Sequence, residues 1–139
     1  MKIVGFLTEK IFAEKKESTH SKIEVKSGLN IVDITEQKIE GQKQNILKFD
    51  FLFSLEYAPN LGKIEVNGSV LILDEENQSK EILKQWKKKN FTHPIKVILF
   101  NLIMNKCNLK ALNLEEQLGL PFHIPFPKIT ASPKTEEEN

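Results

Sequence analysis

Hydrophobic and polar residues alternate most regularly between residues 46 and 57. Apolar side chains occupy every second position there: Leu47, Phe49, Phe51, Phe53, Leu55 and Tyr57. A period of two predicts a strand with one buried face. The segment 58–62 contains proline, asparagine and glycine, which are typical of a short hairpin loop. A second strand is therefore predicted over residues 63–73.

Two further strands are predicted upstream of this hairpin. Residues 29–35 and residues 3–14 read as strands, and the second of these has Phe6 as an apolar member together with Ile11 and Phe12. The lysine- and glutamate-rich segment 14–26 is either a solvated loop or a ragged strand. Its few apolar side chains do not decide whether residues 22–26 pair with a neighbour.

The apolar spacing becomes helical after Asp74. Acidic residues open this segment and three lysines (87–89) close it, which matches the charges that the two ends of a helix favour. A longer helix is predicted over residues 94–118. Proline is tolerated at the first helical position, and Gly119 can end the helix.

The long helix is apolar around most of its circumference. One predicted stripe consists of Ile95, Ile98, Leu99, Leu102, Ile103, Cys107 and Ala111. Val97, Phe100 and Met104 add apolar side chains on the flank or on the opposite side. Such a helix requires cover on two sides. The sheet supplies one cover, and the other is either a second subunit, with Val97, Phe100 and Met104 as the oligomer interface, or the C-terminal segment folding back.

The composition changes twice near the C-terminus. Residues 120–129 mix three prolines with apolar side chains, which favours an extended segment that packs on a surface. Residues 130–139 are polar and acidic, and we expect them to be disordered. The sequence therefore predicts one domain over residues 1–129 and a disordered acidic tail over 130–139.

Charge and cysteine usage narrow the possible classes of protein. The formal net charge is +1, so the chain has no global basic field for nucleic acid. The single cysteine suits a reducing compartment. No secretory signal and no apolar run of bilayer length are visible. We therefore expect a cytoplasmic protein.

No constellation of catalytic or metal-binding residues emerges from the sequence. The imidazole and thiol groups lack the spacing of zinc ligands: His20, His93, His123 and Cys107. A thiol on the apolar stripe of a helix behaves as a small hydrophobe, and glycine motifs that bind phosphate are absent. The pair Glu115-Glu116 is expected to be solvated on a helix surface. We therefore expect no enzyme activity, no metal and no cofactor.

A lysine-rich helix and a surplus of phenylalanine are the two remaining features. Lys84 and lysines 87–89 surround Trp86, which would suit weak nucleic-acid binding, although Trp86 could equally anchor the helix to the core. The chain has nine phenylalanines. Apolar surface that one copy cannot cover usually marks a protein partner. The other explanation is an ordinary core with a packed tail.

The order of these features resembles the SecB chaperone family, in particular its archaeal SecB-like branch, over residues 3–129. The segments that carry the resemblance are Val4-Gly5-Phe6-Leu7 and the residues up to 14, then 30–34, 46–57 and 62–70 as four strands, a connecting helix, the long helix with Ile95-Lys96-Val97-Ile98, and the Leu-Pro-rich close at 120–127. These segments match the family in their pattern of apolar and polar residues, and the resemblance depends on the order in which they follow one another.

The resemblance implies an α+β fold with a four-stranded antiparallel sheet and two C-terminal helices on one face. It further implies a homotetramer, a dimer of dimers, that acts as an ATP-independent holdase for non-native or nascent polypeptides, with protein export as one setting. We expect client-binding residues in apolar grooves: Phe12, Ile64, Val66, Val70, Leu120, Phe122, Ile124 and Phe126.

The chain departs from bacterial SecB proteins at its C-terminus. The residues that end this sequence contain no cysteine or histidine for a zinc-binding tail, and Glu65 is the only acid on the strand face that resembles the SecA-contacting one. A SecA partnership is therefore not expected. A general holdase, or a chaperone dedicated to one client such as an antitoxin, fits better. The alternatives are a structural or adaptor domain with one partner and a weak nucleic-acid binder.

Overall fold

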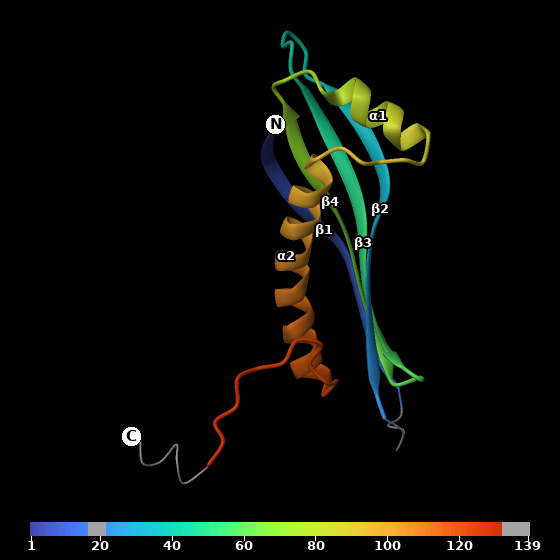
Figure 1. Ribbon diagram of the computed structural model, residues 1–139, viewed down its shortest axis with the longest axis vertical. Coiled ribbons are helices and arrows are strands. Elements are labelled where there is room, and N and C mark those ends of the chain that lie inside the picture. Colours follow the sequence, from blue (N-terminus) through green and yellow to red (C-terminus); the bar gives the residue numbers. More distant parts are fainter. Residues whose placement is uncertain (17–21, 132–139) are drawn as a thin grey trace.

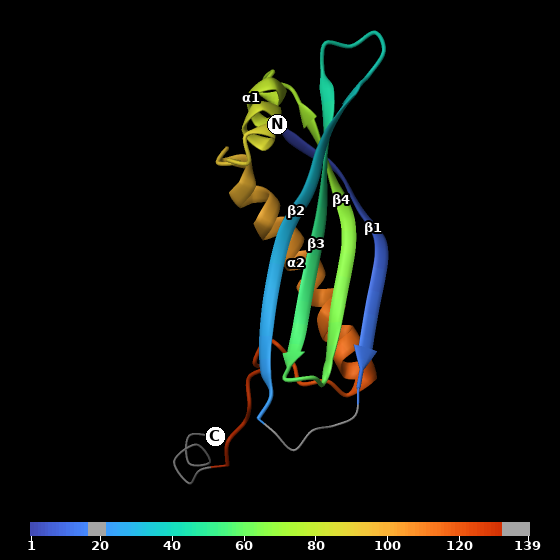
Figure 2. The same ribbon diagram turned by 90° about the vertical axis from the view of Figure 1, so that its right-hand side faces the viewer.

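Four long antiparallel strands form one sheet in a computed structural model, which describes residues 1–16 and 22–131 (Figure 1). The strands are β1 (Lys2–Lys15), β2 (Glu24–Lys38), β3 (Asn45–Ala58) and β4 (Gly62–Asp74). Their order in the sheet is β1-β4-β3-β2 (Figure 2). The hairpin of β3 and β4 therefore lies in the centre and the first two strands lie at the edges. This confirms the predicted four-stranded antiparallel sheet.

The edge strand β2 is longer than the sequence pattern indicated. It begins at Glu24, so residues 24–26 pair with β3, and Val25 lies opposite Tyr57. The pairing continues to Lys38 because β3 offers backbone partners along its whole length. Residues 17–21, which include His20 and part of the proposed loop, lie outside the described residues.

One face of the sheet carries the core. The alternating side chains of β3, from Leu47 to Tyr57, are at most 1% exposed. On β4, Gly68 interrupts the matching apolar row because Phe51 and the Leu7 carbonyl occupy the space that a side chain would need. Phe51 in turn packs on Phe6 of β1, with 5.4 Å between the ring centroids. The period of two therefore becomes a continuous apolar layer across three strands.

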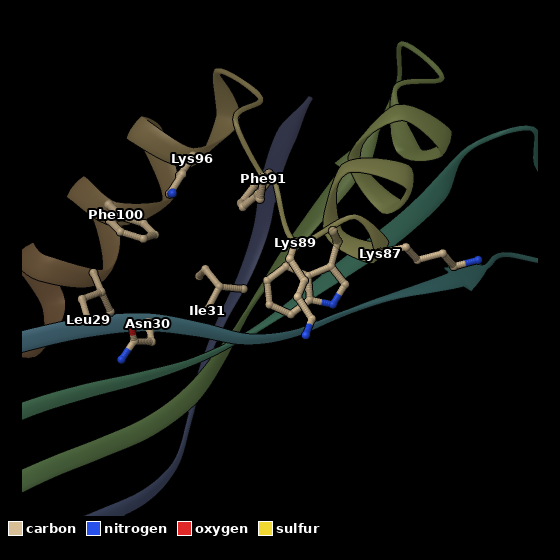
Figure 3. Close-up of a pocket in the computed structure, with 9 residues that line it drawn as sticks. Leu29, Asn30, Ile31, Lys87, Lys89, Phe91, Lys96 and Phe100 are labelled. Atoms are coloured by element: carbon tan, nitrogen blue, oxygen red, sulfur yellow. The ribbon is translucent and has the colours of Figure 1, made fainter.

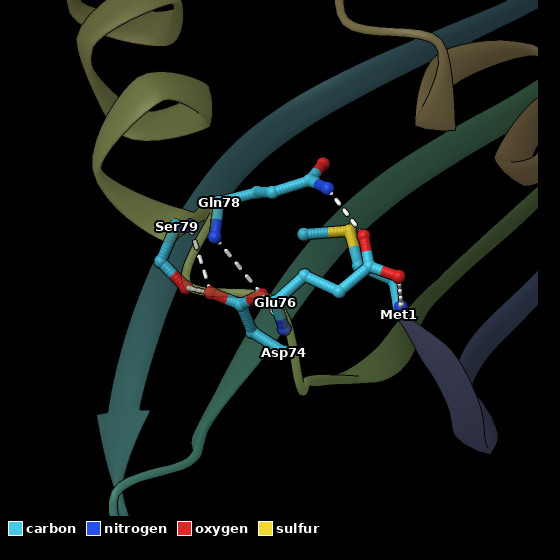
Figure 4. A network of polar contacts seen from close by, with 5 residues as sticks. All are labelled: Met1, Asp74, Glu76, Gln78 and Ser79. Carbon is cyan, nitrogen blue, oxygen red and sulfur yellow. Dashed lines mark hydrogen bonds and ion pairs between the residues drawn. The ribbon is translucent and has the colours of Figure 1, made fainter.

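Two helices, α1 (Ser79–Lys87) and α2 (Ile95–Leu118), cover this face. Asp74 organises the start of α1, as its acidic character suggested: its carboxylate accepts hydrogen bonds from the N–H groups of Gln78 and Ser79 and from the Ser79 hydroxyl (Figure 4). Burial alone would raise the pKa of Asp74, but these hydrogen bonds together lower it below its usual value.

The long helix α2 ends at Gly119, as predicted. Gly119 adopts the left-handed conformation with φ of 70°, and the N–H groups of Gly119 and Leu120 both donate hydrogen bonds to the Glu115 carbonyl oxygen. At the other end, His93 Nδ1 accepts a hydrogen bond of 3.1 Å from the Ile95 N–H. Neither of the two helices in residues 1–16 and 22–131 is long and apolar enough to cross a membrane.

The contact between α2 and the sheet is narrower than the predicted stripe. The fully buried residues recur at every fourth position: Ile95, Leu99, Ile103, Cys107, Ala111 and Glu115. Ile98 and Leu102 were expected in this stripe, but Ile98 is 53% exposed and Leu102 is half-buried. The helix rests on the sheet along one ridge, so side chains beside the ridge, such as Ile98 and Leu102, are covered only in part.

Candidate functional site

The outward face of α2 is the first apolar region that the described chain leaves uncovered. Val97, Ile98 and Leu109 are 64%, 53% and 70% exposed. Of the three residues expected at an oligomer interface, Val97 lies on this face, whereas Phe100 and Met104 are half-buried against the core. The side of α2 that faces away from the sheet therefore presents several apolar side chains to solvent.

The edge strand β1 is the second uncovered region. It exposes Ile3, Val4, Leu7, Ile11 and Phe12. Phe12 lies on the sheet face opposite the helices, where the Lys63 ammonium is 5.3 Å from its ring centroid. One side of β1 pairs with β4 and the other side forms an edge of the sheet. Apolar side chains and unpaired backbone groups therefore occur on the same strand.

The segment after α2 is the third uncovered region. Phe122 and Phe126 are exposed and pack edge to face with centroids 5.0 Å apart, and Ile124 is half-buried. Ile129 is 99% exposed, and the segment leads away from α2 (Figure 1). In the described residues it therefore does not fold back over the outward face of α2.

Four residues expected to bind a client lie in the core instead. Ile64, Val66 and Val70 are 0% exposed because they line the face of the central strand β4 that the core covers. Leu120 is also buried, directly after the end of α2. An unfolded chain cannot reach these side chains while the helices stay in place, which corrects the expectation for these four. Phe12, Phe122, Ile124 and Phe126 keep exposed surface.

A buried acid at the base of α2 corrects a second expectation. Glu115 was expected to be solvated, yet it is 0% exposed. Its carboxylate accepts hydrogen bonds from the Tyr57 hydroxyl and, at 3.1 Å, from the His123 N–H, and it lies 2.8 Å from His123 Nδ1. The other ring nitrogen of His123 is 2.9 Å from Asn108 Oδ1. Glu115 thereby joins β3, α2 and the C-terminal segment.

Burial shifts the acidity of two groups beneath α2. It raises the pKa of the Tyr57 hydroxyl far above its usual value, and the hydrogen bond to Glu115 and the charge of Glu115 act in the same direction. Burial also raises the pKa of the Cys107 thiol to about 11, with a small opposing effect from Lys110. At neutral pH, Cys107 is therefore a thiol, which is a weaker nucleophile than a thiolate. In the described chain, no group of three His, Cys, Asp or Glu side chains could hold a metal ion.

A groove between α1, α2 and β2 was not anticipated from the sequence. It has a volume of about 730 Å³ (Figure 3). Its apolar lining comes from Leu29, Ile31, Trp86, Phe91 and Phe100, and its polar lining from Asn30, Lys87, Lys89 and Lys96. The lysine cluster around Trp86 was the only signal. The structure combines part of that cluster with β2 and the start of α2, which are distant in sequence.

Comparisons with protein-family models, with curated proteins and with solved structures gave no significant match to this chain.

Proposed function

We propose that this chain is an ATP-independent holdase that binds non-native polypeptides on exposed apolar surface. The observation that supports this proposal is that large apolar side chains are exposed in three places: on β1, on the outward face of α2 and on the C-terminal segment. Isolated apolar residues are common on protein surfaces, whereas grouped ones mark interaction sites. Three such groups on a chain of 139 residues favour binding of other polypeptides.

The physical basis of holding a client is burial of apolar surface. Each Å² of apolar area removed from water contributes about 25 cal/mol. This contribution has no directional requirement, so many different sequences can be held. The edges of the sheet add backbone hydrogen bonds to any extended segment. No step of this mechanism requires nucleotide hydrolysis.

The outward face of α2 is better suited to a second copy of the chain than to a client. Ile98, Leu102, Asn105, Leu109 and Leu112 follow the alternating spacing of four and three residues that is characteristic of paired helices. None of these side chains is charged. A single asparagine within such a row fixes the register of pairing. We therefore propose that copies of α2 pair in an oligomer, which leaves β1 and the C-terminal segment for clients.

Membership of the SecB-like family and a cytoplasmic location are part of the same proposal. The family membership is supported by the order of elements, with an antiparallel sheet followed by a connecting helix, a long helix and a proline-rich close. The cytoplasmic location is supported by the one free, buried thiol, Cys107. Assembly as a dimer of dimers and a role in export depend on this membership.

The test of the proposed function is suppression of aggregation. Several unrelated denatured proteins are diluted into buffer without ATP, with and without the purified chain at near-stoichiometric ratio. We expect lower light scattering for all of them. The double substitution Phe122→Ser and Phe126→Ser should weaken the protection, while Lys128→Ser in the same segment should not. A folded wild-type chain that protects no client would contradict the proposal, and one tightly bound folded partner would favour an adaptor instead.

A further inference from the structure

The groove between α1, α2 and β2 combines an apolar floor with a cationic rim. Leu29 and Ile31 of β2 lie across from Phe100 of α2, and Phe91 closes the space between the two helices (Figure 3). We propose that this groove binds extended polypeptide segments in which acidic residues flank an apolar side chain. This inference rests on the proposed binding of non-native polypeptides and specifies which segments are preferred.

The positive charges of the groove are the reason to expect a preference for acidic segments. Lys87, Lys89 and Lys96 line it, and no acidic side chain does. The ion pairs within residues 1–16 and 22–131 do not include any of these three lysines. The groove therefore presents positive charge that a carboxylate from a bound segment can neutralise.

Lys96 and Lys89 border the groove in different ways. The Lys96 ammonium lies 5.9 Å from the Phe91 ring centroid and 5.5 Å from the Phe100 centroid, so it borders the aromatic part of the groove's lining. Lys89 adopts the left-handed backbone conformation with φ of 57°, and its N–H bonds to the Trp86 carbonyl oxygen at 3.0 Å. A left-handed residue directly after the last turn is a common way for a helix to end, so the end of α1 places the backbone of Lys89 at the border of the groove. A short bound segment can therefore place a carboxylate near a lysine and an apolar side chain on the groove lining at the same time.

The backbone of β2 provides the reason for an extended segment. β2 is an edge strand, and the groove is lined by Leu29, Asn30 and Ile31 on this strand. A register irregularity follows between Ile31 and Asp33, where Val32 is exposed. A bound segment that adds to the edge would place alternate side chains in the groove and the others in solvent. The irregularity limits this pairing to a short stretch.

The same features disfavour a nucleic acid as the ligand. Lysines beside an aromatic ring suit phosphates and bases. Here, however, Lys96 already lies near the Phe91 and Phe100 rings, and two aliphatic side chains, Leu29 and Ile31, form the floor. A sheet edge offers backbone hydrogen bonds that a polypeptide can complete along its length. The polypeptide is therefore the occupant that uses every part of the groove.

Trp86 provides a direct reading of occupancy because it is the only tryptophan of the chain and it lines the groove. The probe is a ten-residue peptide without tryptophan, with a central Leu-Phe pair flanked by glutamates, titrated at low salt. We expect a saturable change of Trp86 emission. The peptide with lysines in place of the glutamates should bind at least about tenfold more weakly, given two carboxylate–lysine contacts of the strength of exposed ion pairs.

Two matched double variants distinguish an effect of the groove lysines from an effect of the overall charge of the protein. The double substitution Lys89→Gln and Lys96→Gln should weaken binding of the acidic peptide about tenfold. Lys43→Gln with Lys80→Gln removes the same charge from exposed positions outside the groove and should leave binding unchanged. The urea midpoint of each variant checks that the fold is retained.

Backbone methylation of the peptide tests the sheet edge. Alternate residues of a strand direct their N–H groups toward the same neighbour. N-methylation of one alternate set should therefore abolish the Trp86 signal, while methylation of the other set should leave most of it.

Three outcomes would overturn the inference: equal binding of acidic and basic peptides, equal weakening by the two double substitutions, or tighter binding of a single-stranded oligonucleotide at Trp86. If aggregation is still suppressed in any of these cases, the proposed holdase function survives without the acidic preference. If aggregation is not suppressed while the acidic peptide binds, the groove is a peptide site and the general function fails.

Discussion

Glu115 shows how a single residue can connect three elements. It lies on α2, and its carboxylate accepts hydrogen bonds from the Tyr57 hydroxyl of β3 and from the His123 N–H of the C-terminal segment. A buried carboxylate without partners would be strongly destabilising, so these contacts have to form together. The start of the proline-rich segment is therefore fixed to the body of the protein, while Phe122 and Phe126, on either side of His123, stay exposed.

Removal of this carboxylate should destabilise the fold. Glu115→Ala leaves the Tyr57 hydroxyl and the His123 N–H without an acceptor, and each unsatisfied buried group costs about 1–3 kcal/mol. We expect a loss of about 3 kcal/mol in the free energy of unfolding, measured by urea denaturation. Glu116→Ala, one position along and exposed, is the control and should stay within about 0.5 kcal/mol of wild type. Equal effects of the two substitutions would contradict the role of Glu115.

Tyr57 should lower the stability of the fold as the pH becomes strongly alkaline. Its pKa is raised in the folded state, so its contribution is fully present below the unfolded tyrosine pKa of about 10 and is lost as pH rises above it. The urea midpoint of wild type should therefore fall above about pH 10, and Tyr57→Phe should remove that part of the fall. Cys107 adds a loss between its unfolded pKa of about 8.5 and its folded pKa of about 11, but it is present in both proteins. Parallel curves would contradict the prediction.

Among the elements, β1 can approach β4 closely because Gly68 of β4 has no side chain. A Cβ on Gly68 would meet the Leu7 carbonyl of β1, and it would come within 2.7 Å of Phe51 Cζ. The backbone of β1 cannot move without losing its pairing with β4. Gly68 is therefore a position where the sheet tolerates only glycine.

Gly68→Ala should destabilise the protein by about 3 kcal/mol, at the upper end of the cost of overpacking. Gly28→Ala is the matched control on β2, since its Cβ would meet only the Ser54 hydroxyl at 3.1 Å. Chemical denaturation monitored by circular dichroism compares the two. Similar midpoints for both variants would show that β1 can shift to accept the methyl group.

Periodicity could predict the elements because each is set by local chemistry. The alternation along β3, the proline and glycine between the central strands, and Gly119 after α2 all act within a few residues. The narrow ridge of α2 could not be predicted, because the crossing of the helix over the sheet decides which of Ile98 and Leu99 is buried. The role of Glu115 was missed for the same reason: Tyr57 and His123 lie far from it in sequence or across a turn. Phe122 and Phe126 lie outside α2 because the prolines of their segment cannot continue a helix, and this much was readable from the sequence.

At the scale of the whole molecule, the outward face of α2 should decide the assembly. Leu109→Asp places a charge in the centre of the proposed helix pairing and should lower the mass measured by light scattering after size-exclusion chromatography. Asn113→Asp, on the same helix at an exposed position outside the apolar row, should leave the mass unchanged. A wild-type chain that is monomeric at every concentration would contradict the proposed pairing.

The strand order β1-β4-β3-β2 has a consequence for the synthesis of the protein itself. Both edges come from the first 38 residues, and Lys2 pairs with Leu73 near the end of β4. As the chain leaves the ribosome, β1 therefore has no pairing partner until β4 has been translated, and its apolar side chains stay exposed until then. Sheets built from such distant pairings form slowly and are prone to aggregate while incomplete. A protein proposed to bind unfinished chains is thus itself such a chain until β4 has been made.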